Sequence, residues 1–471
     1  MLKLAVNVKL ATMAALWLLI LEASAKEFRV RSAAEIARAS TKVKPGDTLV
    51  MANGVWTNQA IDFKVRGLAG KPITLRAETP GKVMLVGESS VDICGERVVV
   101  SGLFLNGSTA TGDGIKILGA NCRLTECAVI AGNHKFFVHL YGVSNRMDHC
   151  YLAGKTNDSP TMEIEVESQP NYHLIDYNHF GSRPPLRRNG GETMRVGYSW
   201  QSMSNSCTTV ERNLFDRCDG ELEIISNKSC ENVYRFNTFL DCAGMFTLRH
   251  GNRCVVEGNF FIGHHKRGSG GIRVIGEDQV IINNYIDGVE NGGIWLTAGI
   301  IEPKLVEYFQ VKNCLIAFNT FVDLRGPALQ LDAGYRAPRR ILRPENVTIA
   351  NNVFAVRADG ALLAGTEGEH FKWMGNLASV AAPGAKGIQV VDPKLARADN
   401  DLWRPASDSP VRGAAEGSFP KIKTDMDGHP RTGKLDVGSD QISNAYVELR
   451  PLTADDVGPS WMFRGESPNK Q

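Results

Sequence analysis

The stretch 213-NLFDRCDGELEIISNKSCENVYRFNTFLDCAGMFTLRHGNRCVVEGNFF-261 decides the fold. Within it, the pattern of asparagine, any residue and an aromatic residue occurs at Asn213, Asn237 and Asn259, with gaps of 24 and 22 residues. Short apolar runs rich in Val and Ile lie between these marks and are separated by Gly, Asn and Asp. A repeat of this length built from such runs indicates a solenoid in which similar units stack on one another.

The same pattern extends over most of the chain. It occurs at Asn178, Asn213, Asn237, Asn259, Asn283, Asn319 and Asn352. Successive gaps are 35, 24, 22, 24, 36 and 33 residues, so three gaps exceed the base period by about ten residues. Upstream, Cys127 and Cys150 hold a similar slot 23 residues apart. Insertions into a solenoid become loops at the coil edges, so we expect three such loops.

Short strands, frequent turn residues and the lack of hairpin signals favour parallel strands. Stacked asparagines can pass amide hydrogen bonds from coil to coil, and stacked aromatic rings can fill the interior. Propeller blades are longer than this period, and leucine-rich repeats would show their leucine pattern. We therefore predict an all-β, single-domain, right-handed parallel β-helix with three strands and about 22–24 residues per coil.

Both ends of a solenoid need a cover. The segment 32–41, SAAEIARAST, is the one clear amphipathic helix; Ser32 is a suitable cap, and we expect the helix to cover the N-terminal end. Residues 425–443 resemble the last coils. The predicted β-helix domain is therefore 26–445, followed by a tail or edge cover at 446–471.

Residues 1–25 have the features of an export signal. Lys3 and Lys9 precede an uncharged apolar run, Leu10–Leu21, and the small residues Ala23–Ala25 form a cleavage site. The run is shorter than the roughly 20 residues that span a bilayer. We predict an exported protein, periplasmic or secreted, with no membrane attachment after cleavage; an uncleaved anchor is the alternative.

The mature chain from Lys26 carries 51 basic and 50 acidic side chains, a net charge of +1. This balance argues against a nucleic-acid partner, so any anionic partner must be held by local clusters. Ten cysteines in an exported chain permit disulfides, but the equal 24-residue spacing of Cys218 to Cys242 and of Cys230 to Cys254 favours stacked buried thiols. We expect a monomer.

A cluster of charged residues follows from the coil period. Glu221 and Glu223 are two residues apart and should point to one face of a strand. Arg249 follows Lys228 by 21 residues, so the two should lie side by side on neighbouring coils. Such charges can also form an ordinary ladder of surface salt bridges, although Ser226, Asn227, Ser229 and Asn232 make this cluster denser than a ladder requires.

At these residues the sequence resembles polysaccharide lyase family six, the alginate lyases and chondroitin B lyase. The resemblance is carried jointly by NGGETMRVG at 189–197, NLFDRCDGELEIISNKSCEN at 213–232 and TLRHGN at 247–252. HCYLAGKTND and KPGDTLVMANGVW, further upstream, are also similar to the family. The resemblance covers roughly residues 28–380, and the length is that of the single-domain members.

The resemblance implies a role for each matching residue. Asn189, Glu221 and Glu223 would bind Ca²⁺, Lys228 would be the catalytic base and Arg249 the catalytic acid. His250, Arg273, Arg195 and Arg188 match substrate-binding positions. The implied reaction is calcium-dependent β-elimination on alginate at uronate residues, giving unsaturated oligosaccharides. A chondroitin or dermatan sulfate lyase is the runner-up, and a non-catalytic polysaccharide-binding β-helix is the alternative from another class.

This chemistry suits the residue types. Ca²⁺ prefers six to eight oxygen ligands, and a cation on the uronate carboxylate stabilises the charge that develops when the C5 proton leaves. Lysine acts as a base only when neutral, and nearby cations favour that form. Arginine, with a pKa above about 12, is a poor proton donor, so His250 or water is an alternative acid.

Three basic segments are candidate contacts for an anionic polymer. They are Arg183, Arg187 and Arg188 in the first insertion, Arg336, Arg339, Arg340 and Arg343 in the third, and His264 to Arg267 in GHHKRG. Ordinary solvated loops would look the same. The second insertion, with Ile300 to Phe309, gives no functional signal.

Overall fold

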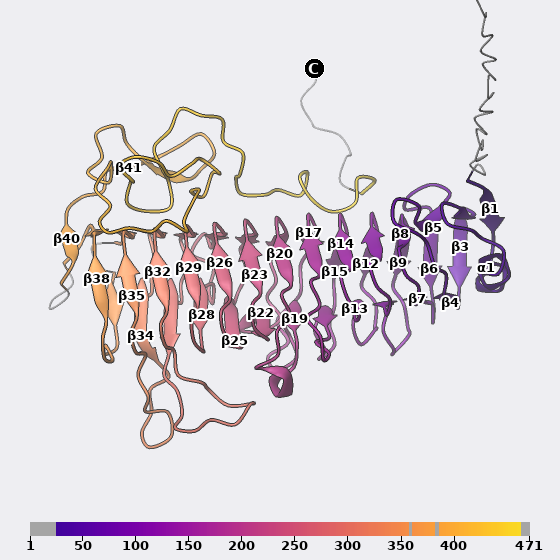
Figure 1. Ribbon diagram of the computed structural model, residues 1–471, viewed down its shortest axis with the longest axis horizontal. Coiled ribbons are helices and arrows are strands. Elements are labelled where there is room, and N and C mark those ends of the chain that lie inside the picture. Colours follow the sequence, from indigo (N-terminus) through magenta and orange to yellow (C-terminus); the bar gives the residue numbers. More distant parts are fainter. Residues whose placement is uncertain (1–24, 358–359, 382–385, 463–471) are drawn as a thin grey trace, which may run out of the picture.

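The computed structural model describes residues 25–357, 360–381 and 386–462 and forms an elongated solenoid of three parallel sheets, which we name A, B and C (Figure 1). Each coil contributes one strand to each sheet, and all strand pairs in these sheets are parallel. The fold is thus the right-handed parallel β-helix that the repeat predicted.

The three sheets run the length of the solenoid. Sheet A contains β1 (Glu27–Val30), β2 (Thr48–Met51), β5 (Ile73–Ala77), β8 (Val98–Ser101), β11 (Arg123–Thr125), β14 (Arg146–Asp148), β17 (Leu174–Asp176), β20 (Thr209–Glu211), β23 (Val233–Arg235), β26 (Val255–Glu257), β29 (Val280–Ile282), β32 (Leu315–Ala317), β35 (Thr348–Ala350) and β38 (Lys372–Met374). Sheet B contains β3 (Gly54–Thr57), β6 (Val83–Val86), β9 (Leu103–Asn106), β12 (Ala128–Ile130), β15 (Tyr151–Ala153), β18 (His179–Phe180), β21 (Leu214–Asp216), β24 (Thr238–Leu240), β27 (Phe260–Ile262), β30 (Tyr285–Asp287), β33 (Thr320–Val322), β36 (Val353–Ala355), β39 (Asn376–Ala378) and β40 (Ile388–Val390). Sheet C contains β4 (Ala60–Phe63), β7 (Ser90–Ile93), β10 (Ile115–Ile117), β13 (Val138–Leu140), β16 (Met162–Ile164), β19 (Met194–Val196), β22 (Glu223–Lys228), β25 (Met245–His250), β28 (Ile272–Val274), β31 (Ile294–Thr297), β34 (Leu329–Ala333) and β37 (Leu363–Ala364).

An asparagine ladder holds the corner between sheets A and B. Each side-chain oxygen accepts hydrogen bonds from the backbone N–H and side-chain amide of the asparagine one coil earlier, at 2.9–3.0 Å between Asn213, Asn237 and Asn259. Cys150 occupies the same slot and donates its N–H to Asn178 at 3.0 Å. The ladder was predicted correctly except at two places: it runs through Asn284 rather than Asn283, and it extends to Asn376.

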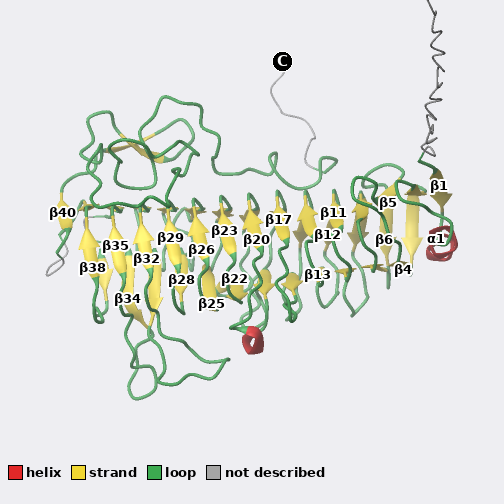
Figure 2. Cartoon of the chain, viewed as in Figure 1, coloured by secondary structure: helices red, strands yellow, loops and turns green. Residues whose placement is uncertain are grey.

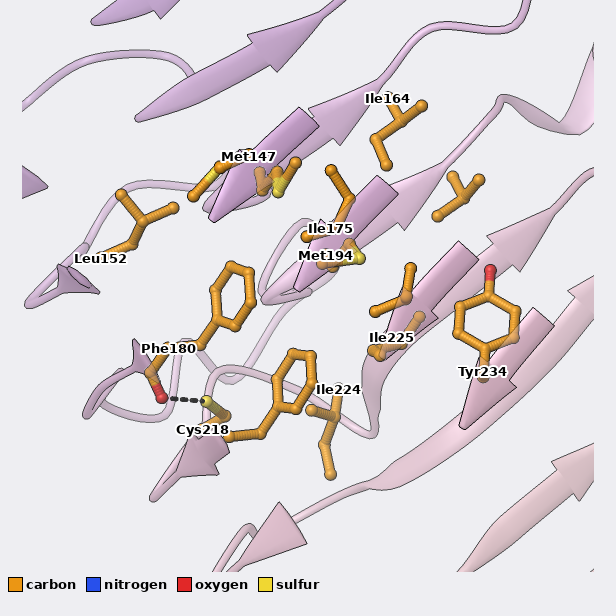
Figure 3. Close-up of a cluster of buried hydrophobic side chains, with 14 of the residues drawn as sticks. Met147, Leu152, Ile164, Ile175, Phe180, Met194, Cys218, Ile224, Ile225 and Tyr234 are labelled. Atoms are coloured by element: carbon orange, nitrogen blue, oxygen red, sulfur yellow. Dashed lines mark hydrogen bonds between the residues drawn. The ribbon is translucent and has the colours of Figure 1, made fainter. Parts of the chain in front are cut away.

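The aromatic residues of the repeat stack inside the solenoid. Ring centroids of Phe180, Phe215, Phe239 and Phe261 follow one another at 4.7, 4.8 and 4.6 Å. Figure 3 shows this interior, with Ile225 of β22 and Met194 of β19 lining it from sheet C. Because the ladder residue in the next coil is Asn284, the inward position falls on Ile286, and Tyr285 points instead to the outer side, where it contacts the C-terminal segment.

The ladder supports a stability prediction. Asn237→Ala should lower the free energy of unfolding by about 2–4 kcal/mol, because it strips buried partners from Asn213 and Asn259 and leaves a cavity. Asn444→Ala, at an exposed position of the C-terminal segment, is the control and should change it by less than about 0.5 kcal/mol. Guanidinium unfolding followed by tryptophan fluorescence measures both; equal midpoints would show that the ladder adds no stability.

All ten cysteines are free, and eight are buried. One of the two predicted pairs stacks: the N–H of Cys218 points at the sulfur of Cys242 at 3.4 Å. The other was wrong, because the N–H of Asn252 points at the sulfur of Cys230 at 3.2 Å and the register Val233–Val255 places Cys254 beside Asn232. The thiols therefore fill slots of the ladder type instead of crosslinking the coils.

The N-terminal end is covered by α1 (Ala33–Ser40), and Ser32 caps it by accepting the N–H of Glu35 (Figure 2). Ile36 of this helix is fully buried, as the amphipathic pattern predicted. All but one residue of the predicted signal peptide lies outside the described residues. Within the described part of the chain, no helix is long and apolar enough to cross a membrane.

The C-terminal segment differs from the prediction. The parallel coils end at β40, and residues 425–443 form no coil. After the antiparallel pair β41 (Leu395–Arg397) and β42 (Trp403–Pro405), the chain runs back along the corner of sheets A and B (Figure 1). Contacts at Asn283, Tyr177 and Glu126 hold it over more than half of the solenoid, which leaves sheet C uncovered.

The insertions lie where sheet C connects to sheet A. Residues 197–208 follow β19, 298–314 follow β31 and 334–347 follow β34; the first contains the short helix η1 (Ser199–Gln201). In Figure 1 they project from the solenoid on either side of β22, β25 and β28. The insertions therefore flank one part of the outer face of sheet C.

Candidate active site

A row of polar side chains runs along the outer face of sheet C between these insertions. Neighbours in register are His139, Glu163, Arg195, Ser226, Thr247 and Arg273. Their flanking residues, such as Met194 and Val196, are fully buried in the core. Because alternate side chains of a strand point to opposite faces, the polar side chains lie on the outer face and the apolar ones in the core.

The pairing of β22 with β25 is irregular, and this sets the positions of the cations. Register shifts occur between Glu223 and Ile225 and between Asn227 and Lys228, so that Lys228 lies opposite His250. Arg249 is the extra residue of the second bulge. The expectation that Lys228 and Arg249 are directly side by side was therefore wrong by one residue, because a bulge redirects side chains.

Three carboxylates converge beside these cations. Oxygens of Glu192, Glu221 and Glu223 lie within 4.8 Å of one another. Glu223 begins β22, but Glu221 lies in the turn before it, which corrects the prediction that both lie on one strand. Gly191 and Gly220 permit the approach: a Cβ on Gly191 would meet the Gly220 carbonyl oxygen at 2.4 Å.

The acidic cluster is electrostatically strained. Burial raises the pKa of Glu221, and the carboxylates of Glu192 and Glu223 raise it further, to about 8. One oxygen of Glu192 is buried without a hydrogen-bond partner. A set of oxygen donors with this unmet negative charge fits a hard divalent cation such as Ca²⁺.

Glu192 is a site residue that the sequence reasoning missed, while two predicted residues lie elsewhere. Asn189 is exposed in the loop three residues before Glu192, and no contact of its amide with the carboxylates occurs among the described residues. Arg188 is also exposed and pairs with Asp158 at 3.4 Å. The roles of both remain predictions.

The three cations reach the carboxylates from two sides. Lys228 Nζ lies 3.9 Å from Glu192, whereas Arg249 and Arg273 approach Glu223 at 3.8 and 3.3 Å. Only 14%, 15% and 11% of the three side chains is exposed, so the cations are largely shielded from solvent. Lys228 and Arg249 were predicted to come together, and they do; Arg273 joins them from the next coil.

His250 is fully buried between Arg249 and the ring of Phe309. Burial, together with Arg249 and Lys228 nearby, lowers its pKa to about 3, so the imidazole is neutral near pH 7. Arg249 can only donate, so Nδ1 accepts from Arg249 at 3.4 Å and Nε2 carries the hydrogen. His250 is thereby excluded as an imidazolium acid near neutral pH.

Arg195 lies in the polar row on β19, on the same coil as Glu192 and one coil from Glu221 and Glu223. It pairs with the buried Glu163 at 2.7 Å, and its guanidinium lies 4.3 Å from the ring centre of Tyr198. Tyr198 in turn stacks on Trp200 at 4.5 Å. These contacts hold the Arg195 guanidinium in one position, from which it would contact substrate if its predicted role is correct.

The second insertion, which gave no functional signal, contributes Tyr308. Its ring lies between two guanidiniums, with centroid distances of 4.2 Å to Arg249 and 4.0 Å to Arg340. The backbone oxygens of Val306 and Glu307 accept from Arg249 at 3.4 Å each. The sequence could not predict these contacts of Tyr308, because the conformation of an inserted loop does not follow the coil period.

Most of the predicted basic contacts are already neutralised. Arg183 is buried and donates to backbone oxygens of Asn157, Ser159 and Gly190, so it fixes the connection between β18 and β19. The first insertion, 197–208, contains none of the three arginines predicted to lie in it. In GHHKRG, Lys266 pairs with Asp219 at 2.6 Å and His264 with Asp241 at 2.9 Å. GHHKRG therefore follows the solvated-loop interpretation, whereas Arg183 has a structural role inside the protein.

Comparisons with known proteins agree with this geometry. A family model described as Chondroitinase B matches residues 30–407. Among solved structures, the family 6 alginate lyase AlyGC has 34% sequence identity and a TM-score of 0.81; the match covers 93% of this chain and 59% of that one. This chain thus spans about three fifths of the length of AlyGC.

Two shorter structures match over nearly their whole length. A mannuronic acid specific family 6 lyase from human gut microbiota has 32% identity and a TM-score of 0.70, covering 78% of this chain and 91% of that one. Pedsa3628 from Pseudopedobacter saltans, a family 6 polysaccharide lyase, has 27% identity and a TM-score of 0.72, covering 92% and 99%. The search of curated proteins found no match.

Proposed function

Because the chain belongs to polysaccharide lyase family 6, we propose that it is a lyase that cleaves an anionic, uronate-containing polysaccharide by β-elimination. The observation that carries the proposal is the convergence of Lys228, Arg249 and the carboxylates of Glu192, Glu221 and Glu223 in one largely buried cluster. A surface ladder of salt bridges would have no reason to bury an unpaired carboxylate oxygen.

Lys228, Arg249 and Arg273 have separate roles in the proposed elimination. Lys228 Nζ removes the C5 proton of the uronate, and the electron pair of that bond forms the C4–C5 double bond as the C4–O bond breaks. Arg249 and Arg273 hold the sugar and stabilise negative charge on the departing oxygen. The inserted loop 298–314 excludes water from the arginines, which strengthens these interactions.

Ca²⁺ is the cofactor that we propose, held by Glu192, Glu221 and Glu223 with Asn189 as the predicted amide ligand. Bound there, it would neutralise the substrate carboxylate and so make the C5 proton more acidic. The donor set supports calcium over zinc, since all ligands are oxygens. Glu192 thus adds a carboxylate ligand to the set Asn189, Glu221 and Glu223 that was predicted from the sequence.

Alginate is the substrate that we favour, because the solved structures with more than 30% identity carry the name alginate lyase or mannuronic acid specific lyase. Dermatan or chondroitin sulfate is the second candidate, favoured by the description of the matching family model. The remaining predictions are an exported, monomeric protein without a nucleic-acid partner.

Digestion of purified polymers tests the proposal. Alginate with calcium should give products with the ultraviolet absorbance of a 4,5-unsaturated uronate, and dermatan sulfate should give far less. The reverse ratio would identify the second candidate. Binding of alginate without any new absorbance, on mannuronate-rich and guluronate-rich blocks alike, would instead support a non-catalytic binding protein.

A further inference from the structure

Tyr308 is fixed over the candidate site by a segment outside the regular coil. The loop 298–314 accepts two hydrogen bonds from Arg249 through Val306 and Glu307, and Phe309 lies edge-on to His250 at 6.3 Å. Residues before and after Tyr308 in the chain therefore contact Arg249 or His250, and these contacts fix Tyr308 beside Arg249. The residue is half-buried.

Three cations surround this phenol. Arg249 comes from β25, Arg273 from β28 and Arg340 from the third insertion, at 4.2, 5.7 and 4.0 Å from the ring centre. Arg273 also pairs with Glu223 at 3.3 Å. This guanidinium thus lies between the tyrosine and the carboxylate cluster.

The leaving oxygen of an elimination needs a proton, and the other nearby groups supply it poorly. Burial lowers the pKa of Arg249, but from a starting value above about 12. His250 is a neutral imidazole near pH 7. Burial raises the pKa of Tyr308, and the three guanidiniums outweigh burial and bring it below its ordinary value. An acid closer to the operating pH transfers its proton more effectively.

We propose that Tyr308 is a catalytic residue whose hydroxyl donates the proton to the departing oxygen. The inference rests on the β-elimination proposed above. In the step, the C5 proton goes to neutral Lys228, the C4–O bond breaks, and the leaving oxygen takes the proton of Tyr308. Arg249 and Arg273 stabilise the resulting phenolate. The phenolate then regains a proton from water, and Lys228 releases its proton to water.

Tyr308→Phe isolates this role, because it keeps the ring between Arg249 and Arg340 and removes only the hydroxyl. We expect kcat on the polymer to fall about 10²- to 10⁴-fold while KM changes less than about threefold. Tyr335→Phe, the same substitution in the third insertion, is the control and should retain the parent kcat. A Tyr308→Phe enzyme within about threefold of the parent kcat would overturn the proposal.

A second substrate separates proton donation from positioning of Arg249. A uronate that carries 4-nitrophenol at O4 has a leaving group that departs as an anion and needs no acid. On it, Tyr308→Phe should match the parent within about threefold; an equal loss on both substrates would assign the hydroxyl to positioning and overturn the proposal. A parent enzyme inactive on every polymer and on this substrate would instead refute the proposed function.

Discussion

Lys228→Met is expected to lower kcat on the preferred polymer about 10²- to 10⁴-fold, the contribution of a positioned general base. The Nζ of Lys228 lies beside the carboxylate cluster, 3.9 Å from Glu192. A divalent cation among those carboxylates would remove the negative charge that favours an ammonium ion there. Methionine keeps the length of the side chain and removes only the basic nitrogen.

The structure offers a matched control on the same sheet. Lys116 on β10 also points outward and pairs with an acid, Asp92, at 2.9 Å, but it lies four coils from β22, roughly 19 Å along the axis. Lys116→Met should leave kcat unchanged. Initial rates at saturating polymer, with thermal melting of both variants to confirm folding, make the comparison. Substantial turnover by a folded Lys228→Met enzyme would remove the residue as the base.

The fold and the centre of the site could be predicted from the sequence because both follow the coil period. Arg249 follows Lys228 by 21 residues and Glu223 by 26, each within a few residues of one coil, so stacking brings it close to both. The β-bulge that sets Lys228 opposite His250 has no periodic signal. Asn283 was chosen over Asn284 because Tyr285 completes the Asn-x-aromatic pattern from Asn283, whereas the residue two positions after Asn284 is Ile286.

Residues whose positions do not follow the coil period could not be predicted from the sequence. Glu192 lies in the connection between β18 and β19, 29 residues before Glu221, so counting coils does not place it beside the other two carboxylates. Tyr308 depends on the path of a 17-residue connection between β31 and β32. The charges of GHHKRG were visible, but their acidic partners Asp219 and Asp241 lie one or two coils away and become neighbours only in the structure.

Calcium binding is expected to release about one proton at pH 7 and to strengthen about tenfold per pH unit up to pH 8. The reason is Glu221, whose pKa burial and the neighbouring carboxylates raise to about 8. Below that value the metal-free site holds a proton on Glu221, and Ca²⁺, which needs the carboxylate, must displace it. Above it the carboxylate is already ionised, so the affinity should level off and proton release should vanish.

Titration calorimetry in buffers of different ionisation enthalpy measures the protons released. Glu221→Gln should abolish the release and weaken binding, since an amide supplies one neutral oxygen in place of a charged pair. Glu257→Gln is the control, because burial also raises the pKa of Glu257 but that residue lies on sheet A, away from the cluster. Calcium affinity that is independent of pH between 6 and 8 would mean that Glu221 is not a protonated ligand with a raised pKa. Unchanged affinity in Glu221→Gln would further remove Glu221 from the ligands and leave Glu192 and Glu223 to hold the cation.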